Sequence, residues 1–203
     1  MSSTNRTNSS ERHVSDYYRT PTQDIVSFLH HWPYVGSMGK NCLIFDPCAG
    51  GDDKNLMSYP EAIFRANAER HDTLFPNYRI ETLDLREDSR AKFKGDYLNV
   101  DIAKFLGEKP DIIITNPPFS HALEITQKAI EDINDDGYVV MLLRLNFLGS
   151  KKRFEFFQTN SPEYCFVHSK RMCFTENGAT DSIEYAHFIW RKRGFKFTKT
   201  KVI

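Results

Sequence analysis

The chain has 203 residues, a formal net charge of zero and a hydrophobic content of 40%. This length supports one domain with a sizeable core, and the zero net charge argues against a strongly basic nucleic-acid-binding protein. No apolar run approaches the length of about 18 residues that a membrane span needs, and the polar N-terminus lacks the apolar core of a secretory signal.

The four cysteines lie at positions 42, 48, 165 and 173, and they form neither a CxxC pair nor a metal-ligand spacing. We expect reduced thiols in a cytoplasmic protein that binds no metal. The charge is unevenly distributed, since residues 144–203 carry 12 Lys/Arg against 5 Asp/Glu and residues 1–143 carry 15 against 22. A basic half is consistent with a polyanionic substrate, although solvated surface charge explains it equally well.

Residues 1–13 are rich in Ser, Thr and Asn and are predicted to form a disordered tail, with a single domain over 14–203. Thr20 is a suitable N-cap for the first helix, with Pro21 in its first helical position. This turn either closes over a bound cofactor or only caps a surface helix.

Apolar patterns predict three helices, at 21–32, 59–71 and 120–134, the last of them capped by Ser120. They also predict strands at 43–45, 79–84, 95–98, 112–115, 138–143, 163–168 and 182–190. The last two strands are expected to form a hairpin at the sheet edge.

A polar turn rich in Asp and Gly follows the first central strand. Gly50 and Gly51 allow a tight turn and a close approach of the backbone to a ligand. The stretch is neither a dinucleotide fingerprint nor a phosphate loop. Asp46, Asp52 and Asp53 suit a cationic ligand, such as one that carries an ammonium and a sulfonium group. The alternative is an ordinary Asp/Gly-rich turn.

Acidic residues also end the next two predicted strands. Asp84 stands at a strand tip, where α/β nucleoside-binding proteins hold ribose hydroxyls, and Asp88 is the weaker candidate. Asp96 could accept a hydrogen bond from a cofactor adenine while Tyr97 packs on its face. The alternative for this pair is an ordinary turn beside the core.

The buried strand 112–115 stops abruptly at Asn116, Pro117, Pro118 and Phe119. The prolines prevent the strand from continuing, because they cannot donate to a ladder. The Asn116 side-chain oxygen and the Pro117 carbonyl can both accept hydrogen bonds from one amino group, and Phe119 can stack on the ring that carries it. Two fixed acceptors would stabilise the positive charge that develops when this amino nitrogen attacks an electrophile. The alternative is a Pro-rich turn that merely ends a strand.

The segments after the next strand are candidates for substrate contact. Arg144, Asn146, Lys151 and Lys152 belong to a polar and basic stretch directly after residues 138–143, and Phe174 lies in a later polar loop. The sequence therefore predicts substrate binding by these five side chains.

Taken together, these motifs resemble the class I S-adenosylmethionine-dependent methyltransferases. The resemblance is carried by Tyr-x-Thr-Pro at 18–21, Asp-Pro-Cys-Ala-Gly-Gly at 46–51, Asp84, Asp-Tyr at 96–97 and Asn-Pro-Pro-Phe at 116–119. Within this class, the chain is similar to DNA adenine-N6 methyltransferases of the small phage and prophage type over about residues 15–192, with further likeness at 83–88, 142–147 and 181–188.

The resemblance implies a Rossmann-like α/β fold, with helices on both faces of a seven-stranded, mostly parallel sheet whose last strand is antiparallel. It implies double-stranded DNA as the partner, with the target base flipped out of the duplex onto Phe119, and Phe174 on its other face. It also implies S-adenosylmethionine as cofactor, with contacts at Tyr18, Thr20, Asp46, Pro47, Cys48, Ala49, Gly50, Asp84, Asp96 and Tyr97. The catalytic motif is Asn116, Pro117, Pro118 and Phe119.

The chain departs from this family in two ways. The helix after Gly51 starts late, which puts the cofactor contacts just beyond that glycine in doubt. No separate recognition domain fits, so any specificity must come from residues 144–162 and 169–182. The alternatives are methylation of RNA adenine or of a protein glutamine amide, and a non-catalytic nucleic-acid- or protein-binding module on the same fold. Target sequence and oligomeric state stay open.

Overall fold

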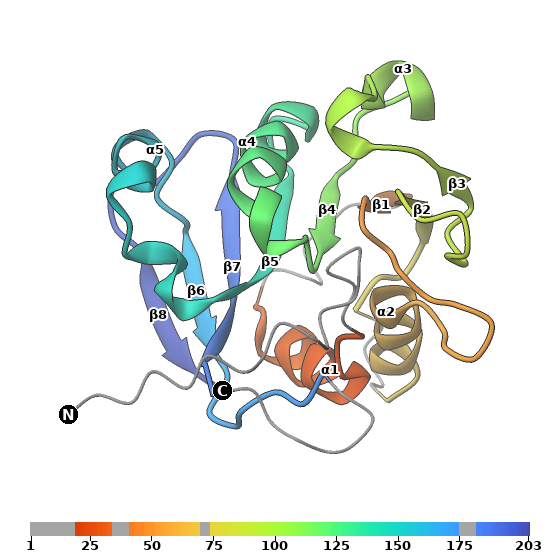
Figure 1. Cartoon of the computed structure of the whole chain (residues 1–203), viewed down its shortest axis with the longest axis horizontal. Helices are drawn as coiled ribbons and strands as arrows, with labels where there is room; N and C mark the ends of the chain where they lie inside the picture. Colours follow the sequence, from red (N-terminus) through yellow and green to blue (C-terminus); the bar gives the residue numbers. More distant parts are fainter. Residues whose placement is uncertain (1–18, 34–40, 70–73, 175–181) are drawn as a thin grey trace.

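One mixed eight-stranded sheet organises the computed structural model, which describes residues 19–33, 41–69, 74–174 and 182–203 (Figure 1). The strands are β1 Cys42–Asp46, β2 Tyr78–Asp84, β3 Phe93–Lys94, β4 Ile112–Thr115, β5 Tyr138–Arg144, β6 Tyr164–Val167, β7 Tyr185–Arg191 and β8 Lys199–Val202. The α-helices are α1 Thr22–His31, α2 Ser58–Glu69, α3 Ile102–Leu106, α4 Ala122–Asp132 and α5 Phe154–Thr159. Short 3₁₀ helices are η3 Tyr97–Asn99, η4 Phe119–His121, η5 Leu145–Leu148 and η6 Lys151–Arg153.

The strand order is β3-β2-β1-β4-β5-β7-β6-β8. Strands β1 to β5 pair in parallel, whereas β7 runs antiparallel to both β5 and β6. The order changes direction at β1, which lies between β2 and β4. The carboxyl ends of β1 and β4 therefore flank the kind of crevice where open α/β sheets bind ligands.

The two faces of the sheet are covered by different helices. Ile112 and Ile114 point into a core shared with α1 and α2, whereas Ile113 points into a core shared with α3, α4 and α5. This alternation follows from the two-residue repeat of a strand, and it confirms the prediction of helices on both faces. Figure 1 shows α1 and α2 apart from α4 and α5.

The far end of the sheet differs from the prediction. The strands predicted at 163–168 and 182–190 do pair antiparallel, but β7 lies inside the sheet between β5 and β6 rather than at the edge. The edge is an unpredicted eighth strand, β8, which pairs in parallel with β6. All four residues of β8 are exposed, so it lacks the apolar alternation of a half-buried strand. Its two lysines are typical of an edge strand that avoids further pairing.

Two predicted helix caps are wrong. The first helix begins at Thr22 with Pro21 as its N-cap residue and no side-chain cap, because the Thr20 hydroxyl has another partner described below. The fourth helix begins at Ala122, after η4, and Ser120 shares a hydrogen bond with His121 instead of capping it. Residues 1–13 and Tyr18 lie outside the described residues.

A buried chain of hydrogen bonds joins α2 to the sheet. The Tyr59 hydroxyl and His187 Nε2 lie 3.2 Å apart, and His187 Nδ1 and His168 Nε2 lie 2.8 Å apart. Phe28 stacks on the His187 ring with a centroid separation of 4.0 Å. Burial lowers the pKa of His168 to about 4 and also lowers the pKa of His187. Both imidazoles are therefore neutral in the folded protein at pH 7.

This pair predicts acid sensitivity. In the unfolded chain a histidine binds its proton near pH 6.5, so between pH 6.5 and 4 the unfolded state binds more protons and stability falls as the pH falls. We expect His168 to lower the free energy of unfolding by about 2 kcal/mol between pH 7 and pH 5. Asp46, whose pKa burial raises to about 7, acts in the opposite direction. Urea unfolding of the wild type and His168→Gln isolates the histidine effect, and equal pH dependence in both proteins would contradict it.

Candidate active site

The proline turn begins with Asn116, whose side-chain amide is held in one orientation by a hydrogen bond. Asn116 directly follows β4, and its Nδ2 donates a hydrogen bond of 3.0 Å to Thr20 Oγ1. Thr20 is only 2% exposed, so the bond is shielded from water. Asn116 Oδ1 is also buried, and within the described part of the chain it has no hydrogen-bond partner.

This arrangement fixes the direction of the amide. The nitrogen end is held by a residue 96 positions earlier in the chain, and the oxygen end is left as an unused acceptor. A buried acceptor without a donor is costly, about 1–3 kcal/mol, so such atoms commonly mark a site that a ligand completes. The group that completes it must donate a hydrogen bond, as an amino group does.

An aromatic cluster surrounds the next part of the turn. The Arg144 guanidinium lies 4.4 Å from the centroid of the Phe119 ring, and Arg144 Nε donates a hydrogen bond of 3.2 Å to the Tyr185 hydroxyl. Tyr185 also contacts Phe119 and Phe174, with ring centroids 5.9 Å and 4.8 Å away. Three predicted site residues, Phe119, Arg144 and Phe174, therefore meet around one tyrosine.

Tyr185 is the residue that sequence reasoning missed. It was given no site role in the sequence analysis, yet it begins β7 and stands opposite Arg144 in the antiparallel pairing with β5. The antiparallel register of β5 and β7 is the signal that could have identified it. In that register the first residue of β7 lies beside the last residue of β5, next to the candidate site. It is 2% exposed and belongs to a small core cluster with Leu142 and Met172.

Two substitutions separate the packing of Tyr185 from its hydrogen bond. Tyr185→Phe removes the acceptor of Arg144 Nε and should lower the free energy of unfolding by about 1 kcal/mol. Tyr185→Ala also removes the ring between Phe119 and Phe174 and should cost roughly 3 kcal/mol or more. Guanidinium unfolding followed by tryptophan fluorescence measures both values. Equal stability of the two variants would show that the ring carries no packing energy.

The predicted cofactor turn is held firmly against β2. Ala49 N donates to the Leu83 carbonyl at 3.0 Å, and Gly50 N donates to Asp84 Oδ2 at 2.7 Å. Gly50 and Gly51 have φ angles of 65° and 76°, a region that favours glycine. The sequence prediction of a tight glycine turn is confirmed.

The Asp84 carboxylate holds the backbone of the glycine turn. Its second carboxylate oxygen accepts a hydrogen bond of 2.8 Å from Arg86 N, so both oxygens bind backbone N–H groups. The residue is 6% exposed and ends β2, as predicted. Its contact with a ribose stays a prediction. The weaker candidate, Asp88, has a side chain that is 71% exposed and pairs with Arg86.

Asp46 is a buried acid at the carboxyl end of β1. Its Oδ1 accepts a hydrogen bond of 3.2 Å from Cys48 N, whereas its Oδ2 is buried without a partner among the described residues. Burial and, to a smaller extent, the charge of Asp84 together raise the pKa of Asp46 to about 7. Burial likewise raises the pKa of the Cys48 thiol, which is therefore protonated. A cationic ligand here would keep Asp46 ionised.

The acidic residues after the glycines form a closed turn of their own. Asp52 Oδ1 accepts hydrogen bonds from Lys54 N and Asn55 N at 2.8 and 2.9 Å. The helix that follows begins at Ser58, so its late start is confirmed. The Cβ that a side chain at Gly51 would add lies 3.1 Å from Arg90 Cβ, which leaves no space for one.

The strand predicted at 95–98 needs correction. The third strand is Phe93–Lys94, and residues 97–99 form η3, whose N-terminus Asp96 caps by accepting from Leu98 N at 3.0 Å. The Tyr97 ring is 3% exposed, and its hydroxyl donates to Asp132 Oδ2 at 2.8 Å. The capping signal of an Asp before a turn outweighed the strand pattern. A cofactor contact at either residue stays a prediction.

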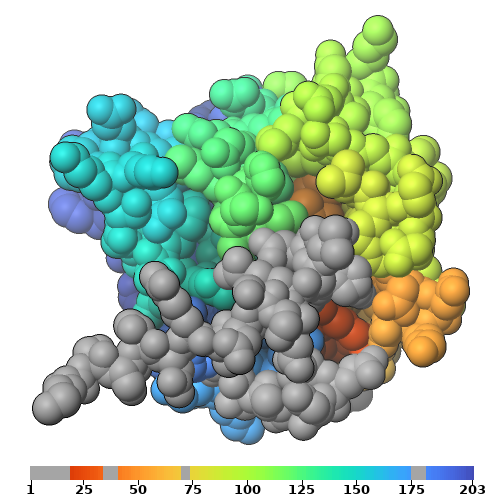
Figure 2. All heavy atoms as spheres, viewed as in Figure 1, coloured from red at the N-terminus to blue at the C-terminus, as the bar shows by residue number. Residues whose placement is uncertain are grey.

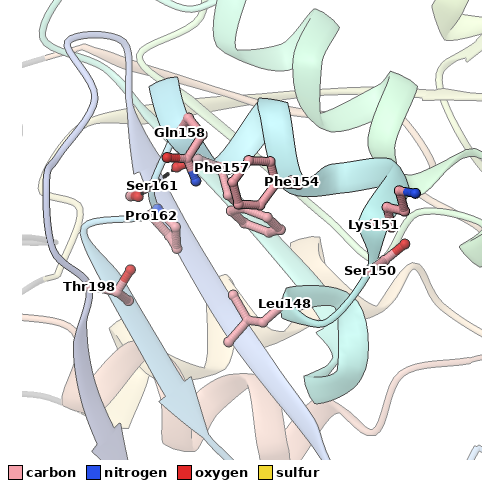
Figure 3. Close-up of a pocket in the computed structure, with 9 residues that line it drawn as sticks. All are labelled: Leu148, Ser150, Lys151, Phe154, Phe157, Gln158, Ser161, Pro162 and Thr198. Carbon is pink, nitrogen blue, oxygen red and sulfur yellow. Dashed lines mark hydrogen bonds between the residues drawn. The ribbon is translucent and has the colours of Figure 1, made fainter.

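The remaining predicted substrate residues lie beyond β5. Asn146 is exposed on η5 and its carbonyl accepts a hydrogen bond from Arg153, while Lys151 and Lys152 are exposed on η6. The described contacts do not bring these three residues to Asn116 or Phe119. Lys151 lines a separate pocket, which Figure 3 shows, whereas Asn146 and Lys152 do not line it.

The described ranges contain neither a metal-binding cluster nor a membrane-spanning helix. No group of three or more His, Cys, Asp or Glu side chains there is placed to hold a metal ion. None of the helices in those ranges has the length and apolarity that a membrane crossing requires. All four cysteines are free thiols.

The sequence matches no protein-family model and no curated protein. The structure resembles solved structures at low sequence identity. A Listeria monocytogenes protein described as a class I S-adenosylmethionine-dependent methyltransferase superposes with a TM-score of 0.62 at 15% identity, over 91% of this chain and 65% of that one. A Vibrio vulnificus modification subunit of a type I restriction enzyme gives 0.61 at 13% identity, over 92% and 47%. A Pyrococcus horikoshii protein described as an RNA methyltransferase gives 0.58 at 16% identity, over 89% of each chain.

These matches confirm the predicted Rossmann-like fold of class I methyltransferases, with eight strands in place of seven. The chain spans less than two thirds of the length of the first two structures.

Proposed function

We propose that this chain transfers a methyl group from S-adenosylmethionine to the N6 amino group of adenine in DNA. The observation that carries the proposal is the buried Asn116 Oδ1, which lacks a donor while Thr20 holds the other end of the amide. An exocyclic amino group supplies the missing donor. Phe119, three residues further on, offers an aromatic ring for the base that carries this amino group.

The residues of the turn account for the chemistry. The adenine amino nitrogen is a weak nucleophile, because its lone pair is delocalised into the ring. Asn116 Oδ1 and the Pro117 carbonyl accept its two hydrogen bonds and stabilise the positive charge that develops on the nitrogen. No strong base is required. Because the amino group of a paired adenine is inside the duplex, the base must leave the stack to reach Asn116.

The crevice above β1 suits the cofactor. When bound, S-adenosylmethionine supplies an activated methyl group on a positively charged sulfur. Gly50 and Gly51 leave the backbone open to close approach, and Asp46 offers a buried carboxylate oxygen without a partner among the described residues. Asp84 fixes this turn and stands where a ribose would lie. The buried Asp46 suits a cation, and the basic side chains at this turn, Arg86 and Arg90, donate to the Gly51 and Asp53 carbonyls.

A second candidate is adenine in RNA, because one structure of the same fold is described as an RNA methyltransferase. The Asn116 geometry serves either nucleic acid. The modification subunit of a restriction enzyme among the similar structures favours DNA. Methylation of a protein glutamine amide would use the same acceptors but has no counterpart among these structures.

The test is transfer of labelled methyl from S-adenosylmethionine to unmethylated duplex DNA, followed by analysis of the nucleosides. N6-methyladenine is the expected product. RNA of the same sequence is assayed in parallel. Label in RNA alone would replace the DNA proposal by the RNA one. Cofactor binding without transfer to either nucleic acid would overturn both, and absence of cofactor binding would favour a binding module.

A further inference from the structure

A pocket of about 510 Å³ lies beside η5, η6 and α5, on the side of β5 toward β8 (Figure 3). Its wall is partly aromatic, with Phe154 and Phe157 next to each other and Leu148 reaching toward them from η5. Lys151 and Thr198 add polar groups at its rim. The volume falls in the range of roughly 300–1,000 Å³ that is typical of small-ligand sites.

The pocket carries positive charge. Lys151 lines it and no acidic side chain does. Neither Lys151 nor Lys152 forms an ion pair with any described residue, and Glu155 is the one acid in residues 144–162. Arg153, by contrast, is engaged, since its Nε donates to the Phe147 carbonyl at 2.6 Å. Arg153 therefore holds the segment in place and leaves the two lysines to face solvent.

Phe154 is unusually exposed for an aromatic residue in the first turn of a helix. Its exposed fraction is 62%, although Phe156 and Phe157 beside it are buried or half-buried. Phe154 stands between Arg153 and Glu155, with Lys151 and Lys152 just before them, and an exposed aromatic ring near basic side chains is a surface on which proteins stack unpaired bases. Figure 2 shows the segment that carries it, in blue-green, at the surface on one side of α4.

One short 3₁₀ helix, η5, links the pocket to the candidate active site along the chain. The 3₁₀ helix η5 follows Arg144 without a break, and the Arg144 guanidinium lies on the Phe119 ring. Leu148, at the other end of η5, lines the pocket. A DNA strand that delivers one base to Phe119 would therefore have its next nucleotides within reach of η5.

We propose that this pocket binds a nucleotide that flanks the target adenine on the same DNA strand. Its base would stack on Phe154, and its phosphate would lie at Lys151 and Lys152. This assignment rests on the proposed function, since it takes DNA to be the substrate. It gives this domain a recognition site of its own.

Binding of a fluorescent duplex, measured without cofactor, tests the pocket. Phe154→Ala should raise the Kd about tenfold, and Phe154→Leu, which keeps an apolar side chain, should do nearly the same because stacking needs a ring. The matched control is Phe64→Ala on α2, where the ring is 67% exposed but lines no part of this pocket. Lys151→Ala should flatten the slope of log Kd against log salt by about 1, whereas the exposed Lys104 can be changed without effect.

An abasic scan locates the nucleotide. Removing single bases around the target should weaken binding of the wild type at one flanking position, and the same removal should have no further effect in Phe154→Ala. The proposal is wrong if base removal and Phe154→Ala have additive effects on the Kd at every position. It is also wrong if Phe154→Ala and Phe64→Ala bind DNA with equal affinity. These outcomes do not involve methyl transfer, so the proposed function can stand when the pocket fails. Conversely, absent methylation with the expected binding losses would refute the proposed function and retain a DNA-binding pocket.

Discussion

Asn116→Ala is expected to lower the rate of methyl transfer by about 10²- to 10³-fold, as removal of one group that stabilises developing charge typically does. The affinity for S-adenosylmethionine should stay nearly unchanged, because the amide is directed at the amino group of the base. Single-turnover transfer assays give the rate, and calorimetric titration gives the cofactor affinity. Undiminished transfer by this variant would rule out Asn116 as a catalytic residue.

Thr20 provides the matched control as a positioning residue. Thr20→Val keeps the shape of the side chain but removes the acceptor that holds Asn116 Nδ2. Loss of one such hydrogen bond corresponds to a fall of roughly 3- to 10-fold in turnover. Thr20→Ser retains the hydroxyl and should restore most of the rate. A fall in turnover without a change in KM for DNA distinguishes misorientation of the amide from weaker substrate binding.

Asp84→Ala is expected to have the largest effect on stability and on cofactor binding. It leaves Gly50 N and Arg86 N buried without acceptors, and each unsatisfied group costs about 1–3 kcal/mol. The glycine turn would detach from β2, so the crevice at the end of β1 would lose its shape. Urea unfolding and cofactor titration measure the two consequences.

Asp88→Ala is the comparison for Asp84, since this 71% exposed carboxylate pairs with the Arg86 side chain closer to solvent and should cost less stability than the loss of the Asp84 carboxylate. Asp84→Asn keeps one acceptor oxygen but turns an amide NH₂ toward a backbone N–H, so it should also be destabilising. Wild-type stability of Asp84→Ala would contradict the role of this carboxylate in holding the backbone of the glycine turn. Wild-type stability combined with lost cofactor binding would instead assign the carboxylate to the ligand.

The central part of the fold was predictable because its signals are local. The apolar runs of β1 and β4 end in turns whose glycines and prolines mark the strand boundaries, and Gly137 directly precedes the apolar run of β5. The glycine turn and the proline turn follow β1 and β4, and both predictions of position were correct. The acid at the end of β2 was located by the same reasoning.

What could not be predicted depends on contacts distant in the sequence. Thr20 has the local signature of a helix cap, yet its hydroxyl binds an amide 96 residues away. Tyr185 looks like any aromatic strand residue until the antiparallel register places it opposite Arg144. The strand β8 gives no apolar pattern because it is exposed at the sheet edge. Each of these features depends on contacts between residues far apart in the sequence, and no short stretch of the sequence shows such contacts.

If a base stacks on Phe119, as proposed, the Arg144 guanidinium competes with it for that ring. The guanidinium covers a face of the ring at 4.4 Å, so a base that stacks there must first displace it. Only molecules with the arginine withdrawn can accept the base, and the apparent affinity is reduced by that fraction. The displaced guanidinium keeps its charge and can then bind a phosphate of the same strand. Entry of the base and capture of the backbone are thereby coupled through one side chain.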